Sequence, residues 1–265
     1  MKIYISADIE GITGTTNWDE TEKKHPDYAE FRDQMTAEVA AACEGALAAG
    51  ATEIMVKDAH DSARNIQADK LPKGSLLWRG WSGHPYTMVD GMDSSYAAVL
   101  MIGYHSRAGS HTNPLSHSMS LGDVYIKIND TYASEFLINA YATALSGVPV
   151  VFVSGDAGLC KEVQGINPAV KTVAVKEGIG NSTINIHPQL AVEQIRSGVE
   201  QALKGDLKQY LIKLPEKFSV DIRFKEHTKA YSSSFYPGVS LPEPYTIHFE
   251  SKDYFEVLRM FAFVF

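Results

Sequence analysis

Residues 2–11 read Lys2-Ile3-Tyr4-Ile5-Ser6-Ala7-Asp8-Ile9-Glu10-Gly11, a short apolar run that leads into two carboxylates and a glycine. The run predicts a β-strand over residues 2–5. In extended backbone the side chains of residues i and i+2 point to the same side, so Asp8 and Glu10 are expected to face one common point. Gly11 has no Cβ where the chain must turn away. Such an acid pair can bind a metal, act as acid and base, or cap the next helix.

The segments that follow this stretch predict a β-α-β opening. A helix is expected from about Tyr28 to Ala49-Gly50, because apolar residues recur at every fourth position and a glycine ends the pattern. A second strand is expected at residues 53–57. This order favours a parallel sheet with right-handed crossovers.

The rest of the chain divides into two parts by its hydrophobic pattern. Further strands are predicted at residues 97–102, 124–128, 148–154 and 170–175, with helices from about Ser134 to Gly147 and over 188–204. The segment 69–93 predicts one strand with loops that form an interface or a lid. Beyond residue 206 the pattern alternates at 218–224 and 245–249, and Ser251 is expected to cap a last helix. We therefore expect an α/β domain with a mostly parallel sheet over 1–205 and a smaller α+β unit over 206–265.

Composition excludes several classes of partner. The chain has 265 residues, 45% of them hydrophobic, and a formal net charge of -8 without a Lys/Arg-rich block. This charge argues against nucleic acid and anionic membranes as partners. Cys43 and Cys160 are far apart among apolar neighbours, as is typical of free thiols in a reducing compartment. Residues 136–155 carry no charge, but Gly147 and Pro149 divide them into a helix end and a strand rather than a membrane span. The N-terminus shows no signal-peptide pattern, so we expect a cytoplasmic protein.

Metal-competent side chains follow three of the predicted strands. Asp8 and Glu10 come after the first, His60 after the second and His105 after the buried strand at 97–102. The carboxyl ends of parallel strands lie along one edge of a sheet, so these side chains are expected to meet there, with Glu135 reaching them from a helix start.

Each of these residues also has a structural alternative. Either histidine can simply bond a carbonyl oxygen, and Glu135 can complement the helix dipole. Asp58, Asp61 and Asp156 fit turns and caps. The remaining histidines outside the strand ends are interpreted as surface or structural residues: His84, His111, His187, His227 and His248.

The expected ligand set favours zinc, manganese or cobalt over magnesium, because it combines two imidazoles with carboxylates. Three carboxylates leave one positive charge on a pair of divalent ions, which favours a bound hydroxide. Two ions about 3.5–4 Å apart that share one carboxylate would generate that hydroxide near neutral pH. Asp8 is the predicted bridge.

Several spaced motifs occur together in a recognisable order: Ser6-Ala7-Asp8-Ile9-Glu10-Gly11, Asp58-Ala59-His60, Gly103-Tyr104-His105-Ser106, Ser116-His117-Ser118-Met119, Glu135 followed by Asn139-Ala140-Tyr141, and Ser154-Gly155-Asp156. In these motifs the sequence resembles the zinc-dependent D-aminopeptidases of the dipeptide-transport-protein family. The resemblance covers most of the chain to about residue 205.

The resemblance implies roles for individual residues. It places one zinc on Asp8, Glu10 and His60, and a second on Asp8, His105 and Glu135. It puts His117 at the position of the catalytic histidine. It further implies a three-layer α/β/α fold, removal of N-terminal D-amino acids from short peptides, and a ring-shaped homo-oligomer, a decamer.

Our hypothesis from the sequence is metal-assisted peptide hydrolysis. A bridging hydroxide attacks a carbonyl polarised by one zinc, while the other zinc binds the free α-amine. His117 acts as general acid or steadies the oxyanion, and a nucleophilic role for it is disfavoured because a hydroxide is already present. Two alternatives stay open: the same bimetal site acting on a phosphoester or cyclic amide, and a non-catalytic peptide-binding subunit of a transporter.

Overall fold

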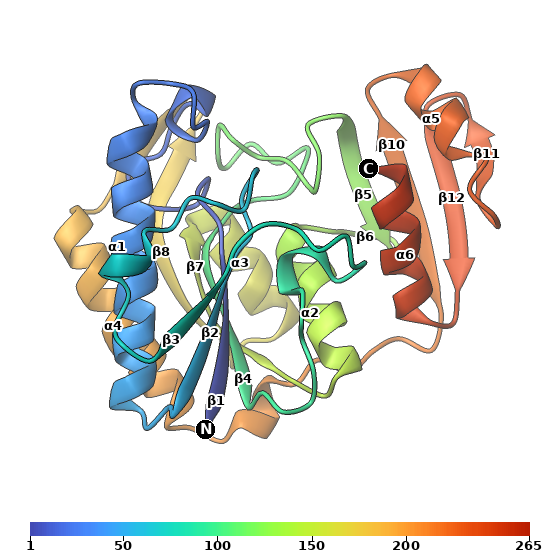
Figure 1. Ribbon diagram of the computed structural model, residues 1–265. Coiled ribbons are helices and arrows are strands. Elements are labelled where there is room, and N and C mark those ends of the chain that lie inside the picture. Colours follow the sequence, from blue (N-terminus) through green and yellow to red (C-terminus); the bar gives the residue numbers. More distant parts are fainter.

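A seven-stranded sheet forms the centre of the larger lobe in the computed structural model, which describes residues 1–265 (Figure 1). Its strands lie in the order β3-β2-β1-β4-β7-β8-β9. All neighbours from β3 to β8 pair in parallel, and only β9 is antiparallel. The bounds are β1 Lys2–Ala7, β2 Glu53–Asp58, β3 Ser75–Trp78, β4 Ala98–Tyr104, β7 Val150–Asp156, β8 Lys171–Ile179 and β9 Ser182–Asn185.

Helices cover both faces of this sheet, which confirms the three-layer α/β/α fold. Helix α1 (Tyr28–Ala48) packs against α4 (Pro188–Leu203) on one face. Helices α2 (Glu135–Leu145) and α3 (Ala157–Ile166) belong to the crossovers on the other side of the sheet, as right-handed connections require. Gly45 permits the close contact between α1 and α4, because a Cβ there would lie 2.4 Å from the Arg196 carbonyl oxygen.

The chain reverses its direction of sheet growth between β1 and β4. From β1 it adds β2 and β3 on one side, whereas from β4 it adds β7 and β8 on the other. The carboxyl ends at such a switch point border a crevice where ligands bind. Here the backbones also approach closely: the Gly11 N–H donates to the Gly103 carbonyl (2.8 Å), and a Cβ on Gly11 would lie 1.7 Å from the Tyr104 carbonyl oxygen. Gly11 is thus required by this approach.

The second lobe contains an antiparallel sheet of five strands in the order β11-β12-β10-β5-β6. Its strands are β5 Asp123–Ile128, β6 Thr131–Tyr132, β10 Phe218–Phe224, β11 Ser240–Glu243 and β12 Thr246–Ser251, and its helices are α5 His227–Ser233 and α6 Tyr254–Val264. The side chains of β10 alternate between buried and half-buried, as its sequence pattern predicts. Strands β5 and β6 come from the middle of the chain and pair into this sheet. The division near residue 206 stays a prediction.

The structure corrects or extends some local expectations. Asp253, and not Ser251, caps α6: its side chain accepts the Phe255 N–H (2.9 Å), whereas Ser251 is the last residue of β12. Asp156 caps the unpredicted helix α3 by accepting the Leu159 N–H (2.9 Å). Single-turn 3-10 helices lie at Trp18–Glu20 (η1), Ala68–Lys70 (η2), Thr87–Val89 (η3) and Leu207–Tyr210 (η4).

One apolar core of 64 buried residues extends through both lobes. Aromatic residues join them: Tyr141 of α2 and Phe218 of β10 both pack against the Tyr254 ring of α6, whose hydroxyl donates to the Ile138 carbonyl (2.9 Å). The two lobes therefore hold the loops between them in a fixed arrangement. Cys43 and Cys160 are both buried and free. The helices are all too short or too polar to cross a membrane.

Candidate metal centre

The five residues predicted as metal ligands meet at the switch point of the large sheet. Asp8 and Glu10 follow β1, His60 follows β2, His105 follows β4, and Glu135 is the first residue of α2. Each is at most 7% exposed. Elements that are distant in sequence thus place three carboxylates and two imidazoles in one buried cluster.

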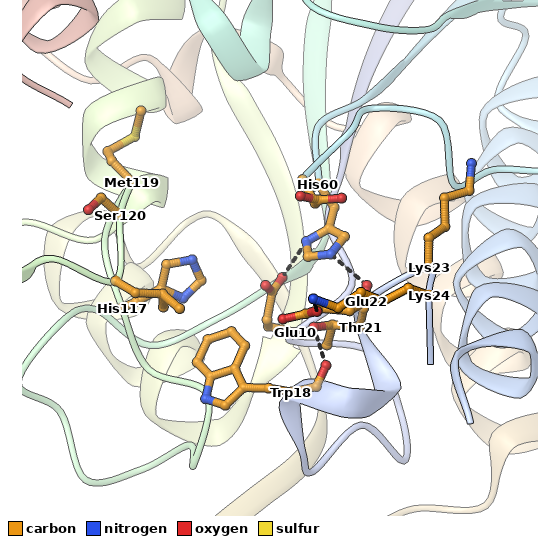
Figure 2. Close-up of a pocket in the computed structure, with 12 residues that line it drawn as sticks. Glu10, Trp18, Thr21, Glu22, Lys23, Lys24, His60, His117, Met119 and Ser120 are labelled. Atoms are coloured by element: carbon orange, nitrogen blue, oxygen red, sulfur yellow. Dashed lines mark hydrogen bonds and ion pairs between the residues drawn. The ribbon is translucent and has the colours of Figure 1, made fainter. Parts of the chain in front are cut away.

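Asp8 lies between the two histidines. Its Oδ1 is 3.3 Å from His60 Nδ1, and its Oδ2 is 3.5 Å from His105 Nε2. The Ile9 N–H donates to Oδ1 (2.9 Å), which fixes the orientation of the carboxylate. Glu10 Oε2 lies 3.1 Å from His60 Nδ1, so this histidine faces two carboxylates at once (Figure 2).

Glu135 forms the other side of the cluster, together with a third histidine. Its Oε2 is 3.3 Å from His105 Nε2, and its Oε1 is 3.6 Å from His117 Nε2. The Met119 N–H donates to Oε1 (2.7 Å). Two groups of side chains are close enough to hold an ion: Asp8, Glu10 and His105 in one, and His105, His117 and Glu135 in the other.

The ring of His117 is held between two other rings. It stacks on His105 with centroids 4.2 Å apart and an interplanar angle of 12°, and Trp18 packs on it edge-on at 5.4 Å. Figure 2 shows His117 and Trp18 on the same side of the cavity, facing Glu10 and His60. His117 therefore borders the cluster from the loop between β4 and β5.

Backbone carbonyls set the orientation of all three histidines. His60 Nε2, His105 Nδ1 and His117 Nδ1 each lie 3.0 Å from a carbonyl oxygen, those of Thr21, Ser106 and Leu115 respectively. A ring N–H that donates to a carbonyl leaves the other nitrogen with a lone pair. In each case this second nitrogen points toward the carboxylates, as a metal ligand must.

Two buried atoms of the cluster lack a hydrogen-bond partner. They are Glu10 Oε2 and His105 Nε2, and both face the interior of the cluster. Buried polar atoms are normally paired, and each unpaired one costs about 1–3 kcal/mol. Bound metal ions would satisfy these atoms, so the donor set fits a zinc site of imidazoles and carboxylates.

The charges of the cluster are strongly coupled. Burial and the nearby Glu10 raise the pKa of Asp8 well above its usual range. Burial opposes ionisation of Glu135 as well, but His105 outweighs it and brings the pKa of Glu135 to about 2. Burial lowers the pKa of His105, yet Glu135 more than compensates and raises it to about 10. The carboxylates thus hold protons on the histidines, and a divalent ion that binds here has to displace those protons.

His117 behaves differently from the other two histidines. Burial and the neighbouring His105 lower the pKa of His117 below its usual value. Its imidazole is therefore neutral at neutral pH, with Nε2 free to accept a proton.

A buried lysine that the sequence did not reveal supports the loop after β1. Lys176 of β8 is 3% exposed, and its ammonium donates to the carbonyls of Glu10 and Thr15, both at 2.5 Å. Asn113 also donates to the Glu10 carbonyl (3.1 Å) and is itself held by Asp156 (3.0 Å). Strand β8 also contains Lys171 and Glu177, so nothing in its sequence distinguishes Lys176.

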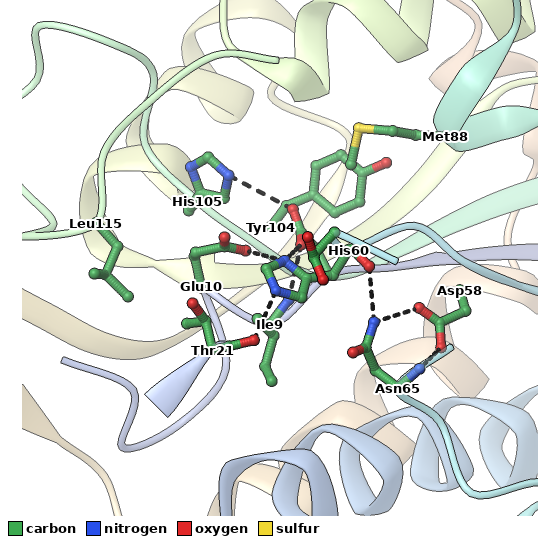
Figure 3. Close-up of polar contacts among 12 residues, drawn as sticks. Ile9, Glu10, Thr21, Asp58, His60, Asn65, Met88, Tyr104, His105 and Leu115 are labelled. Atoms are coloured by element: carbon green, nitrogen blue, oxygen red, sulfur yellow. Dashed lines mark hydrogen bonds and ion pairs between the residues drawn. The ribbon is translucent and has the colours of Figure 1, made fainter. Parts of the chain in front are cut away.

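Asp58, the last residue of β2, holds the loop that follows this strand. Its carboxylate accepts the backbone N–H groups of Asn65 (2.5 Å) and Ile66 (2.8 Å) and the side-chain amide of Asn65 (2.8 Å). The same amide donates to the His60 carbonyl at 2.8 Å (Figure 3). Asp58 thus fixes the segment that carries His60.

Two cavities adjoin the cluster. The smaller, about 310 Å³, is bordered by the cluster and by Ala59, Trp81 and Met88. The larger, about 540 Å³, extends toward Trp18 and the segment of residues 21–24. Five residues line both cavities: Glu10, His60, Asp61, His117 and Met119. The cluster is therefore accessible to a small ligand that spans both spaces.

Comparisons with known proteins agree with this arrangement. A family model described as D-aminopeptidase, peptidase family M55, matches residues 1–263. The D-aminopeptidase of Bacillus subtilis (strain 168) is 32% identical over 264 residues, which cover 98% of this chain and 94% of the relative. The solved structure of the Zn-dependent D-aminopeptidase DppA from Bacillus subtilis, described as a self-compartmentalizing protease, is similar with a TM-score of 0.94 and 30% identity, over 100% of this chain and 96% of that one. The similarity thus includes the C-terminal lobe.

Proposed function

This chain belongs to the peptidase M55 family and is a zinc-dependent D-aminopeptidase, and we propose that it releases N-terminal D-amino acids from short peptides at a site for two zinc ions. The observation that carries the two-ion site is the arrangement of Asp8, whose two oxygens face different histidines at 3.3 and 3.5 Å. The family assignment leaves no support for a phosphoesterase or a non-catalytic transporter subunit.

We propose a division of the side chains around Asp8, which differs from the two groups defined by distance because His60 belongs to neither of them and His105 to both. Glu10 and His60 would complete one zinc site with Asp8 Oδ1, and His105 and Glu135 would complete the other with Asp8 Oδ2. The unpaired Glu10 Oε2 and His105 Nε2 support one site each. When bound, the two zinc ions supply an acidified water and polarise the scissile carbonyl.

Proton transfer falls to His117, because all three carboxylates are ligands in this scheme. Its Nδ1–H donates to the Leu115 carbonyl, so the neutral ring presents Nε2 as an acceptor. We assign to Nε2 the proton of the attacking water, which it then passes to the amine of the leaving residue. Stacking on His105 and packing by Trp18 hold the ring in position for both steps.

Assembly into a larger particle is part of the proposal. The Bacillus subtilis relative is described as self-compartmentalizing, and we propose that this chain forms a ring-shaped decamer. Large apolar side chains at the surface of the smaller lobe support self-association: Tyr231, Phe235 and Phe263 are 59%, 71% and 74% exposed. Native mass spectrometry should give about 290 kDa, ten chains of 29.1 kDa.

The stereochemistry of the product and one ligand substitution test the function together. The enzyme should release D-alanine from D-alanyl-D-alanine and leave L-alanyl-L-alanine intact. Glu10→Gln should lose zinc and activity, because the amide supplies no negative charge to the ion. Glu177→Gln, which changes a carboxylate on the exposed part of β8, serves as the control and should keep both. Equal hydrolysis of the two dipeptides would contradict the proposal.

A further inference from the structure

Asp61 lies beside the candidate metal centre, and its side chain makes no hydrogen bond or ion pair within the protein. It follows His60 directly and is one of the five residues that line both cavities. It is exposed, its carboxylate accepts no hydrogen bond, and no basic nitrogen lies within 4.0 Å of it. Lys24 on the same wall pairs with Glu22 instead (2.9 Å). Asp61 therefore offers a free negative charge where the two cavities meet.

The backbone around Asp61 is held in an uncommon conformation. Asp61 has φ 45° and Ala63 has φ 51°, both in the left-handed region. Three contacts enforce this turn: Ala63 N–H to the His60 carbonyl, Gly80 N–H to the Ala63 carbonyl, and the Trp81 indole N–H to the Asp61 carbonyl, all at 2.7 Å. Non-glycine residues held this way cluster at functional sites, because the surrounding structure must enforce them.

The Trp81 anchor is itself fixed. The Lys57 ammonium lies over the Trp81 ring at 4.1 Å from its centroid and donates to the Gly80 carbonyl at 2.6 Å. The turn that carries Asp61 is therefore tied to the end of β2 on one side and to the loop after β3 on the other. Asp61 is presented to the cavities on a rigid support.

We propose that the Asp61 carboxylate binds the α-ammonium group of the substrate, an inference that rests on the proposed peptidase function. Among the five residues shared by the cavities, Glu10, His60 and His117 already have roles and Met119 is uncharged. An ammonium that enters beside two divalent cations needs an anion, and Asp61 is the carboxylate left for it. The cavity of about 310 Å³ then holds the single N-terminal residue, and the larger one holds the leaving part.

This assignment differs from the expectation that a zinc ion binds the amine. If Asp61 takes the ammonium, the amine keeps its proton and contributes affinity through a charge-assisted hydrogen bond. If zinc takes it, Asp61 has no part in recognition. The two cases predict different results for the same substitution.

The test compares D-alanyl-D-alanine with N-propionyl-D-alanine, which lacks the amine, on the full-length zinc-loaded enzyme. Asp61→Asn keeps the shape and tolerates the left-handed backbone. It should raise KM for D-alanyl-D-alanine by about 10- to 100-fold, the value of a hydrogen bond between charged groups, with kcat and zinc content close to wild type. The ratio of kcat/KM for D-alanyl-D-alanine to that for N-propionyl-D-alanine should fall by the same factor. Asp61→Glu should recover part of the loss, because the charge is retained.

Asp69→Asn is the matched control, since Asp69 lies in η2 outside both cavities and should leave KM unchanged. An Asp61→Asn enzyme with wild-type KM and wild-type preference for the free amine would overturn the assignment. A wild-type enzyme that binds zinc but does not hydrolyse D-alanyl-D-alanine would contradict the proposed function and this inference with it.

Discussion

Replacing Lys176 with methionine should weaken zinc binding much more than it weakens the fold. The Lys176 ammonium gives one hydrogen bond each to the carbonyls of Glu10 and Thr15. Bonds from a charged donor contribute about 1.5–3 kcal/mol each. Burial works against them, because it lowers the pKa of Lys176 from 10.5 to about 8, which corresponds to about 3 kcal/mol. The two effects largely cancel, and the net loss of stability should be within about 3 kcal/mol.

The position of the loop that carries Glu10, in contrast to the stability of the fold, should change when Lys176 is replaced. Without Lys176 the Thr15 carbonyl loses its ammonium partner, and the Glu10 carbonyl keeps only Asn113. Groups that orient a metal ligand from behind typically contribute about 10- to 100-fold in metal affinity. We therefore expect Lys176→Met to bind zinc about 10- to 100-fold more weakly at the site that contains Glu10.

Zinc titration against a competing chelator measures this directly, with a thermal melt in parallel. Lys217→Met is the control, because Lys217 pairs with Glu250 (2.8 Å) in the smaller lobe, away from the Glu10 loop. It should retain wild-type zinc affinity. Equal zinc affinity in wild type and Lys176→Met would refute the positioning role of Lys176.

Three further substitutions test the role of His117, the burial of Asp123 and the close approach at Gly11. His117→Ala should keep two zinc ions per chain by atomic absorption and lose most turnover; loss of one zinc would instead make His117 a ligand with His105 and Glu135. Burial raises the pKa of Asp123 from 3.8 to about 7, so the folded state holds a proton that the unfolded state releases, and stability falls as the pH rises through that window. At pH 8 the free energy of unfolding of Asp123→Asn should therefore exceed that of wild type by at most about 4 kcal/mol, and its melting temperature should be higher. Near pH 4 the two proteins should be equally stable, and a stability difference that does not change with pH would speak against this. Gly11→Ala should reduce both zinc content and melting temperature, because its Cβ would collide with the Tyr104 carbonyl oxygen at 1.7 Å, and wild-type values for both would contradict the close approach.

The meeting of Asp8, Glu10, His60 and His105 was predictable because it depends only on strand order. Each residue lies within three residues of the end of a strand, and parallel strands end at one edge of the sheet. Their positions in space therefore follow from local patterns and one topological rule.

Residues that depend on long loops were not predictable in the same way. His117 lies in an irregular loop, and only the family resemblance pointed to it. Lys176 and Asp61 gained their positions from contacts with distant backbone atoms, which leave no periodic signal in sequence. Similarly, the alternation at 124–128 predicts a strand but does not say which sheet it joins.

Zinc content per chain, measured together with D-alanyl-D-alanine hydrolysis before and after chelation, decides whether the cluster is a catalytic centre with two zinc ions. We expect two zinc ions per chain, loss of hydrolysis when they are removed, and recovery when zinc is returned. Hydrolysis that persists at full rate in a metal-free, chelator-treated enzyme would contradict this expectation.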